Sequence, residues 1–277
     1  MIVATALVLS LLSAVALNWG WVVQHGAASG LPALSLRAPL RSLRSLFGDL
    51  SWVTGFVVGL AGWALYIGAL TLAPLSLVQG VSAGGIALLA AFSHRRGAEL
   101  SRFQWWAVGI ATVGLVLLAV SLAGGAGKPH AVGAVTVVAW LAVLGAVAAL
   151  AGRVSLGVTA GVLYGAGDIA TKGATFGGAW LLLIGAVLAA HGLAFVALQF
   201  GFQRGGALAT AGTATLLTNA LPIVAGIALF HEHLPGGALG ATRVIAFVLV
   251  VVAAALLARE DAPALRAEPR LGLTERV

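Results

Sequence analysis

Long apolar segments alternate with short polar ones from the start of the chain to about residue 258. Each of nine segments is close to the ~20 residues that an α-helix needs to cross the hydrocarbon core of a bilayer. The pattern therefore predicts an all-α polytopic membrane protein with nine transmembrane helices. We place these helices near residues 2–24, 51–72, 75–92, 103–123, 131–150, 154–172, 179–201, 207–230 and 239–258.

Two segments need separate interpretation. The first apolar segment contains no basic residue, whereas a signal peptide begins with a basic region, so we expect a transmembrane helix there. Residues 25–50 are too weakly apolar to span the bilayer, but they place Arg41 and Arg44 on one helical face and Leu43 and Phe47 on another. A helix that lies in the membrane interface and an ordinary basic loop both fit this pattern.

The composition supports a membrane protein. Of 277 residues, 61% are hydrophobic and only 8% are charged, and the mean hydropathy is +1.07. A soluble domain carries about 25% charged residues. The 38 glycines are typical of membrane helices that pack closely. The chain has no cysteine, which excludes disulfides, thiolate metal sites and cysteine nucleophiles.

The basic residues predict the orientation. With nine spans, the 15 basic residues fall on one side of the membrane except for Lys128, Lys172 and Arg243. Cytoplasmic loops carry the excess of Lys and Arg, so the N-terminus is expected outside and the C-terminus in the cytoplasm. The net charge of +7 therefore reports orientation in the plasma (inner) membrane and not binding of nucleic acid. Residues 259–277 are polar and are expected to form a disordered cytoplasmic tail.

The two halves of the chain resemble each other. Residues 70–120 and 201–258 both contain a turn, a helix rich in small residues, an exit ending in Phe and His, a short polar loop and a final apolar helix. Because the first of these loops is expected inside and the second outside, the repeats are inverted, as in many secondary transporters. The transmembrane domain, residues 1–258, then consists of a first repeat of four helices (about 1–123) and a second of five (about 131–258).

Three segments resemble a known family. They are ALNWGWVVQHG at 16–26, the stretch at 52–78 that contains Trp63 and Tyr66, and LYGAGDIATKG at 163–173. These segments are similar to the NIPA-type magnesium transporter branch of the EamA-like drug/metabolite transporter (DMT) superfamily, and ALTLAPLSLVQGV at 69–81 is similar to the superfamily in general. The resemblance implies nine helices, an outside N-terminus and transport of magnesium or another small substrate.

The sixth predicted span contains an acid and a base one turn apart. At about 1.5 Å per residue, Asp168 lies about 21 Å from the start of the span at Val154. An unpaired Asp at such depth costs about 2.5–3.5 kcal/mol, and Lys172 can pair with it at i,i+4. Asp168 is either a cation, metal or proton site, with Lys172 and Tyr164 beside it, or part of a fixed structural pair in which Lys172 reaches the headgroups.

The same span has glycines at four-residue intervals. Gly157, Gly161 and Gly165 form a smooth face, which predicts a close helix neighbour. Gly167 and Gly173 bracket the charged pair and permit a bend.

Neutral polar residues in other spans complete the predicted substrate site. Thr215 and Asn219 are one turn apart, and Pro222 frees a backbone carbonyl near Thr218 that could coordinate an ion. Each residue alone is also explained by hydrogen bonding between helices. The predicted substrate-binding residues are Asp168, Lys172, Tyr164, His191, Thr215, Asn219, Gln79 and Asn18, with Asp168 as the metal contact.

Enzymatic activity is not expected. The sequence shows no nucleophile–base pair or phosphate loop, and the consecutive residues His231, Glu232 and His233 would point apart on a helix, as in an ordinary polar turn. No catalytic residue and no cofactor is expected, apart from transported Mg²⁺ or a coupling proton.

The sequence therefore predicts a secondary transporter of a small cation, with magnesium among the candidates, or of a polar metabolite, by alternating access. The alternative is a non-transporting membrane scaffold or accessory subunit. The expected partners are the lipid bilayer and a small-molecule or ion substrate. No nucleic acid is expected, and a homodimer is left open.

Overall fold

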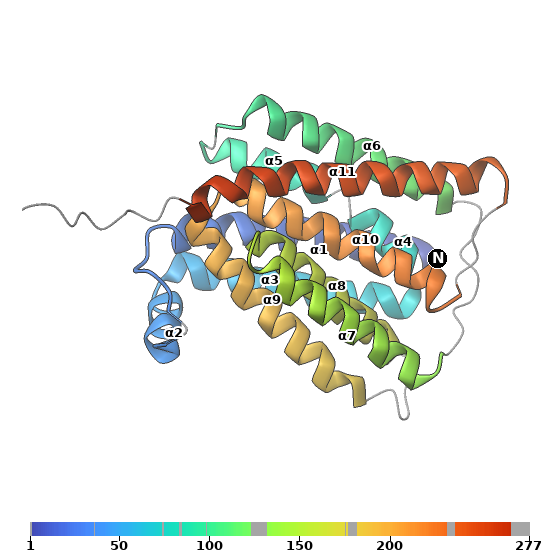
Figure 1. The fold of residues 1–277 in the computed structure, drawn as a ribbon, viewed down its shortest axis with the longest axis horizontal. Coiled ribbons are helices and arrows are strands. Elements are labelled where there is room, and N and C mark those ends of the chain that lie inside the picture. Colours follow the sequence, from blue (N-terminus) through green and yellow to red (C-terminus); the bar gives the residue numbers. More distant parts are fainter. Residues whose placement is uncertain are drawn as a thin grey trace, which may run out of the picture.

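The computed structural model describes residues 2–35, 37–73, 75–82, 85–97, 99–122, 132–174, 176, 182–231 and 236–266. Within these ranges the regular elements are helices, and they form one elongated bundle with the N-terminus at the end opposite to the C-terminal end of α11 (Figure 1). The helices are α1 (Ile2–Ala28), α2 (Pro39–Phe47), α3 (Leu50–Leu72), α4 (Leu75–Ser82), α5 (Gly85–Arg95), α6 (Arg102–Leu122), α7 (Ala134–Ala151), α8 (Leu156–Ala174), α9 (Ile184–Arg204), the π-helical segment η2 (Leu208–Gly212), α10 (Thr213–Ala228) and α11 (Ala238–Arg266).

The prediction of a polytopic membrane protein is confirmed in its general form. Five described helices are long and apolar enough to cross a bilayer, and two further apolar helices are shorter, at Val135–Ala151 and Ala238–Ala253. The five lie within α1, α3, α6 and α9 and across η2 with α10.

The third predicted span, 75–92, is helical wherever the structure describes it, in α4 and α5; residues 83 and 84 between them lie outside the described residues. The expected helix start at Pro74 lies outside the described residues, as do Lys128, Glu232 and His233.

The last helix is longer than expected. It continues to Arg266, past the predicted end of the span at 258 and into the segment expected to be a disordered tail. Residues 267–277 lie outside the described residues, and the disorder of the tail stays a prediction.

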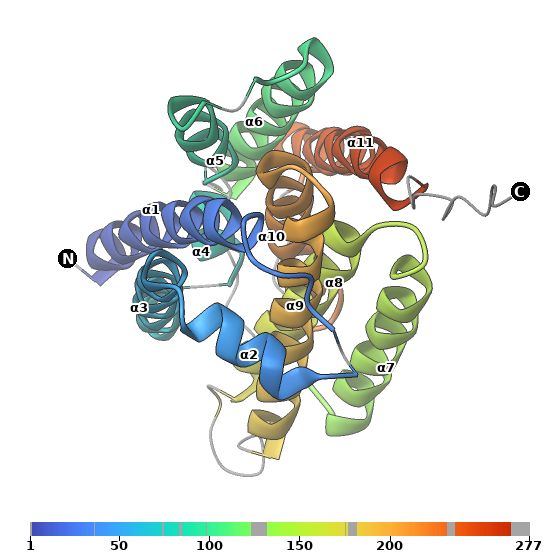
Figure 2. The ribbon, with the colours of Figure 1, turned by 90° about the vertical axis from the view of Figure 1, so that its left-hand side faces the viewer.

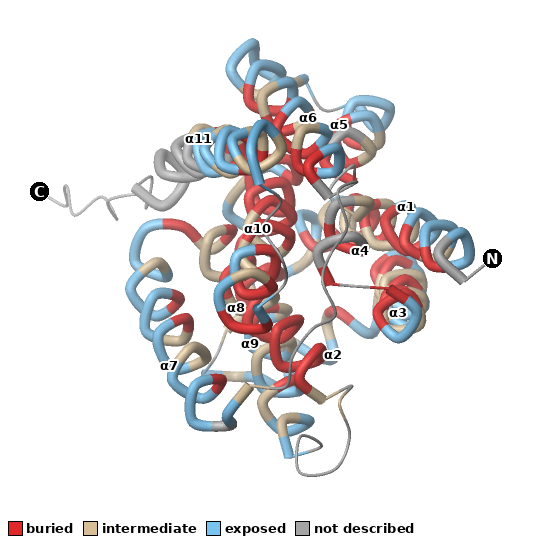
Figure 3. Tube along the Cα trace, turned by 90° about the vertical axis from the view of Figure 1, so that its right-hand side faces the viewer, coloured by how far each residue is buried: buried red, intermediate tan, exposed pale blue. Residues whose placement is uncertain are grey.

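Helices α8 and α10 occupy the centre of the bundle, where Figure 3 shows mostly buried chain. The glycine face predicted on α8 lies against α10. A Cβ atom at Gly161 would come within 2.9 Å of the Ala214 backbone, and one at Gly165 within 3.1 Å of Leu221. Only glycine permits so close an approach at Gly161.

The packing repeats in the two halves of the chain. In the first half, α1 packs along α3 and also contacts α4 and α5; in the second, α8 packs along α9 and also contacts α10. The closing helices of the two halves, α6 and α11, pack against each other. α7 packs on α8 at the edge of the bundle (Figure 2).

The basic segment after α1 contains a helix. α2 exposes Arg41 and Arg44, and of its residues only Leu46 is buried. It lies across one end of the bundle, next to α3 (Figure 2). The Asp49 carboxylate accepts a hydrogen bond from the Trp52 amide at 2.8 Å and so caps the start of α3. The segment is therefore helical, while its position in the interface stays a prediction.

The crossing of α1 and α3 predicts a stability effect. A Cβ atom at Gly20 would lie 2.6 Å from the Gly55 carbonyl oxygen, so Gly20→Ala must separate the two helices. We expect a loss of about 1–3 kcal/mol, measured as a lower midpoint of thermal unfolding in detergent. The matched control is Gly109→Ala on α6, where no heavy atom lies within 4 Å. Equal effects of the two substitutions would contradict the close crossing.

Candidate functional site

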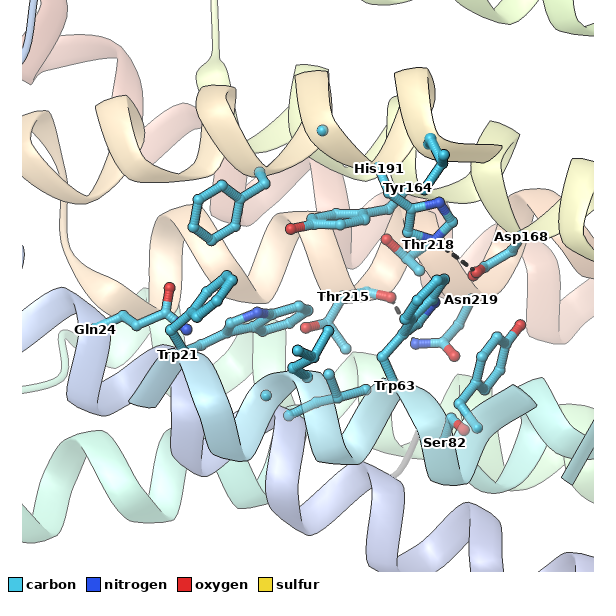
Figure 4. Close-up of a pocket in the computed structure, with 18 of the residues that line it drawn as sticks. Trp21, Gln24, Trp63, Ser82, Tyr164, Asp168, His191, Thr215, Thr218 and Asn219 are labelled. Carbon is cyan, nitrogen blue, oxygen red and sulfur yellow. Dashed lines mark hydrogen bonds and ion pairs between the residues drawn. The ribbon is translucent and has the colours of Figure 1, made fainter. Parts of the chain in front are cut away.

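A cavity with a volume of about 500 Å³ lies inside the bundle. Its described lining residues come from α1, α2, α3, α4, α8, α9 and α10, so both halves of the chain contribute to it. Most of the lining is apolar, and the cavity extends from Gln24 at one end to Asp168 at the other (Figure 4). This combination of size and mostly apolar walls with a few polar groups is typical of small-molecule sites.

Asp168 is the charged group of this cavity. It lies on α8, is 4% exposed, and its carboxylate contacts two other helices. Oδ1 lies 3.4 Å from Nε2 of His191 on α9, and Oδ2 accepts a hydrogen bond of 3.0 Å from the Gln79 amide on α4. Gln79 also donates to the Tyr66 hydroxyl at 2.6 Å. The acid therefore links α8 to both halves of the chain.

The orientation of His191 depends on its two ring nitrogens. Nδ1 lies 2.9 Å from the Val187 carbonyl oxygen of its own helix, while Nε2 faces Asp168. Both neighbours are acceptors, so a proton must lie between Nε2 and the carboxylate for both contacts to be hydrogen bonds.

Gly167 makes room for this histidine. A Cβ atom at Gly167 would overlap the His191 imidazole. The sequence suggested that Gly167 permits a bend, but in the structure it lies within the continuous helix α8. Its contribution is space for the ring beside Asp168.

Thr215 and Asn219 lie on α10 and line the same cavity, as their spacing suggests. The Thr215 hydroxyl donates to the Ala211 carbonyl at 2.7 Å, and the Asn219 amide donates to the Thr215 carbonyl at 2.6 Å. These bonds use the Thr215 hydroxyl proton and one of the two Asn219 amide protons, so the pair can offer a ligand their side-chain oxygens and the second Asn219 N–H.

The predicted residues do not all meet. The cavity brings together Asp168, Tyr164, His191, Thr215, Asn219 and Gln79. Lys172 is buried one turn from Asp168 on α8, but it is not among the described lining residues.

Asn18 also lies away from the cavity lining. Its amide donates to the Ala14 carbonyl at 2.8 Å, and its side chain packs against Gly85 at the start of α5. It therefore contacts the start of α5, and its predicted contact with substrate stays a prediction.

The aromatic walls of the cavity were not predicted. Trp21, Trp63, Phe56 and Phe195 line it together with Tyr164. The Trp63 and Tyr164 rings lie 5.3 and 5.7 Å from the His191 ring. A signal was present in the sequence, because Trp21 lies in the family-like segment 16–26, but no spacing rule separates a cavity-facing tryptophan from a lipid-facing one.

A hydrogen-bonded chain joins three helices near the Gln24 end of the cavity. The Trp52 indole donates to Gln199 at 2.9 Å, and the Gln199 amide donates to Gln24 at 2.7 Å. These three buried residues join α3, α9 and α1. Phe47 of α2 packs edge-on against Trp52, with 4.9 Å between ring centres.

The described residues contain no group of three His, Cys, Asp or Glu side chains that could hold a metal ion. His231 is described and has a positive φ of 51°, as in a tight turn. The next two residues, Glu232 and His233, lie outside the described residues.

A search of known proteins found one similar sequence that is described as a transporter. Over 131 residues the chain is 37% identical to the probable magnesium transporter NIPA9 of Arabidopsis thaliana, which confirms the resemblance to NIPA-type transporters. The match covers 47% of this chain and 37% of the plant protein. No family model and no solved structure matches the chain.

The contact between Gly167 and His191 predicts a specific rescue. Gly167→Ala should lower the free energy of unfolding by about 1–3 kcal/mol, because the methyl group displaces the imidazole. Adding His191→Ala should recover most of this loss, since the ring is what the methyl group meets. Thermal unfolding in detergent measures both. Gly185→Ala, with no heavy atom within 4 Å, is the control. Strictly additive losses in the double variant would contradict the contact.

Proposed function

We propose that this protein is a secondary transporter that moves a small cation across the membrane by alternating access, with Asp168 at the substrate site. The observation that carries the proposal is a buried carboxylate on the wall of an internal cavity. An acid inside a membrane-spanning bundle is costly, and acids that face such cavities mark the paths of ions and substrates.

The similarity to the plant protein supports transport and makes magnesium a candidate substrate of this chain. Mg²⁺ keeps several waters and binds through one or two carboxylates. Asp168 is the one carboxylate among the described lining residues, so a magnesium ion would meet it with most of its water shell in place.

The packing supports two inverted repeats of four and five helices. The contacts of α1 with α3, α4 and α5 correspond to those of α8 with α9 and α10, which leaves α7 as the additional helix of the second repeat.

The contacts beside the cavity suggest how access alternates. α4 and α10 contact each other beside the cavity, and Gln79 on α4 bonds Asp168 on α8. A rocking of one repeat against the other would loosen that hydrogen bond and open the cavity on the side away from α2. A cation that takes over the contacts of Gln79 with Asp168 would favour this movement.

A scaffold or accessory subunit would also use glycine-lined helix contacts, but it would need neither the cavity nor the acid. For this reason we rank it second. A homodimer and a coupling proton stay predictions.

The charge distribution supports an N-terminus outside the cell. The His25 ring contacts the Gly205 carbonyl at 3.2 Å, so the end of α1 lies beside the end of α9. α2 lies across the same end of the bundle. By the positive-inside rule this basic end faces the cytoplasm. The order of the helices along the chain places these described arginines at the basic end: Arg37, Arg41, Arg44, Arg95, Arg96, Arg102, Arg153 and Arg204.

The proposal predicts a loss of transport without the acid. In proteoliposomes loaded with fluorescent indicators, we expect the wild-type protein to carry at least one cation from a panel of Mg²⁺, Na⁺ and tetramethylammonium. Asp168→Asn should slow that flux at least tenfold, about 1.4 kcal/mol, because the amide cannot balance the charge of the cargo. Glu99→Gln, on an exposed loop, is the matched control. A normal rate for Asp168→Asn would refute the site.

The orientation predicts opposite labelling of two introduced cysteines in a chain that has none. Ser29→Cys follows α1 at the basic end, and Gly236→Cys precedes α11 at the other end; both positions are exposed. In intact bacterial cells an impermeant maleimide should label only the cysteine at 236. Labelling at 29 before the cells are opened would reverse the topology.

A further inference from the structure

The cavity walls have the chemistry of a site for organic cations. Trp21, Trp63 and Tyr164 line the cavity between Gln24 and Asp168 (Figure 4), and Phe56 and Phe195 extend the aromatic wall toward α2. The Trp21 and Tyr164 ring centres are 6.2 Å apart, and those of Phe56 and Phe195 are 5.5 Å apart. Aromatic faces attract cations within about 6 Å of the ring centre, and they do so best when the cation has shed its water.

The same walls are a poor match for a compact divalent ion. Such an ion needs a shell of oxygen ligands, and the lining is mostly apolar with Asp168 as the one described carboxylate. The described residues also contain no group of three metal-binding side chains. The single negative charge of Asp168 balances the charge of a monovalent cation, and the aromatic rings can contact an apolar part of the same ligand.

Access favours the same class of ligand. Leu60 on α3 and Leu188 on α9 line the cavity and are 51% and 64% exposed. The cavity is therefore open at these residues of α3 and α9, and an opening along the side of membrane-spanning helices faces lipid. A cation with an apolar body partitions into the lipid bilayer, whereas a hydrated metal ion does not.

We propose that the cavity binds a monovalent organic cation with an apolar or aromatic body. Its positive group lies beside Asp168, near the Trp63 and Tyr164 rings, and its body lies along Trp21, Phe56 and Phe195. A volume of about 500 Å³ accommodates a ligand of drug-like size. This inference rests on the proposed function and names the class of cargo for that same site.

The test is equilibrium binding of radiolabelled benzyltrimethylammonium to the full-length chain in detergent. The wild-type protein should bind it saturably. Neopentylbenzene, in which carbon replaces the charged nitrogen, should compete at least a hundredfold more weakly. Asp168→Asn should remove this preference for the charged compound, because the amide carries no charge to balance the ammonium group.

A second set of variants tests the aromatic wall. Trp63→Leu should weaken binding about tenfold, and Trp63→Phe, which keeps a ring, should weaken it less. The control is Trp106→Leu on α6, a tryptophan that is 71% exposed and does not line the cavity; its affinity should equal that of the wild type. Equal effects of Trp63→Leu and Trp63→Phe would overturn the role of the ring even if both variants are less stable.

The outcomes separate this inference from the proposed function. If Mg²⁺ flux depends on Asp168 while benzyltrimethylammonium does not bind, the organic-cation inference is wrong and the transport proposal stands. If neopentylbenzene competes as well as the cation, the cavity selects shape and the inference is also wrong. If no cation binds or moves in a manner that depends on Asp168, both fail.

Discussion

A carboxylate inside a membrane-spanning bundle must be surrounded by polar partners or by water, because lipid offers neither, and this requirement organises the centre of the protein. Asp168 meets it through Gln79 on α4 and His191 on α9, so one side chain connects three helices from both halves of the chain. The contact with His191 requires a glycine at 167, and the close approach of α10 requires one at 161. Glycine packing around α8 thus follows from the need to enclose the acid.

The cavity beside Asp168 provides space for a ligand next to the carboxylate. The polar end of the cavity holds the carboxylate, and the rest is built from aromatic side chains of α1, α3, α8 and α9. One of the helices that flank it, α10, is preceded by the π-helical segment η2. Such π-helical turns frequently lie at functional sites.

Much of this arrangement could be predicted from the sequence, for a physical reason. Polar residues in apolar spans must face inward, so Gln79, His191, Thr215 and Asn219 could be grouped with Asp168 before any contact was known. The spacing of Gly161 and Gly165 indicated a close neighbour, because four-residue spacing fixes one helix face.

The rest depends on contacts between helices, which spacing within a helix does not contain. Spacing along α8 suggested Lys172 as a partner of Asp168, which stays a prediction, but it could not reveal the contacts of Asp168 with Gln79 on α4 and His191 on α9. Trp63 in the cavity and Trp106 on the outer surface have equally apolar surroundings in the sequence.

The central claim is that a ligand reaches the Asp168 carboxylate, and its most direct measurement is chemical protection of that group. Dicyclohexylcarbodiimide, an apolar reagent for carboxyl groups, would be applied to the protein in membranes, and labelling at each acid would be read by peptide mass spectrometry. The account predicts labelling at Asp168 that a saturating cation suppresses, while labelling at the exposed Glu99 is unchanged by the cation. Labelling of Asp168 that no cation suppresses would contradict it.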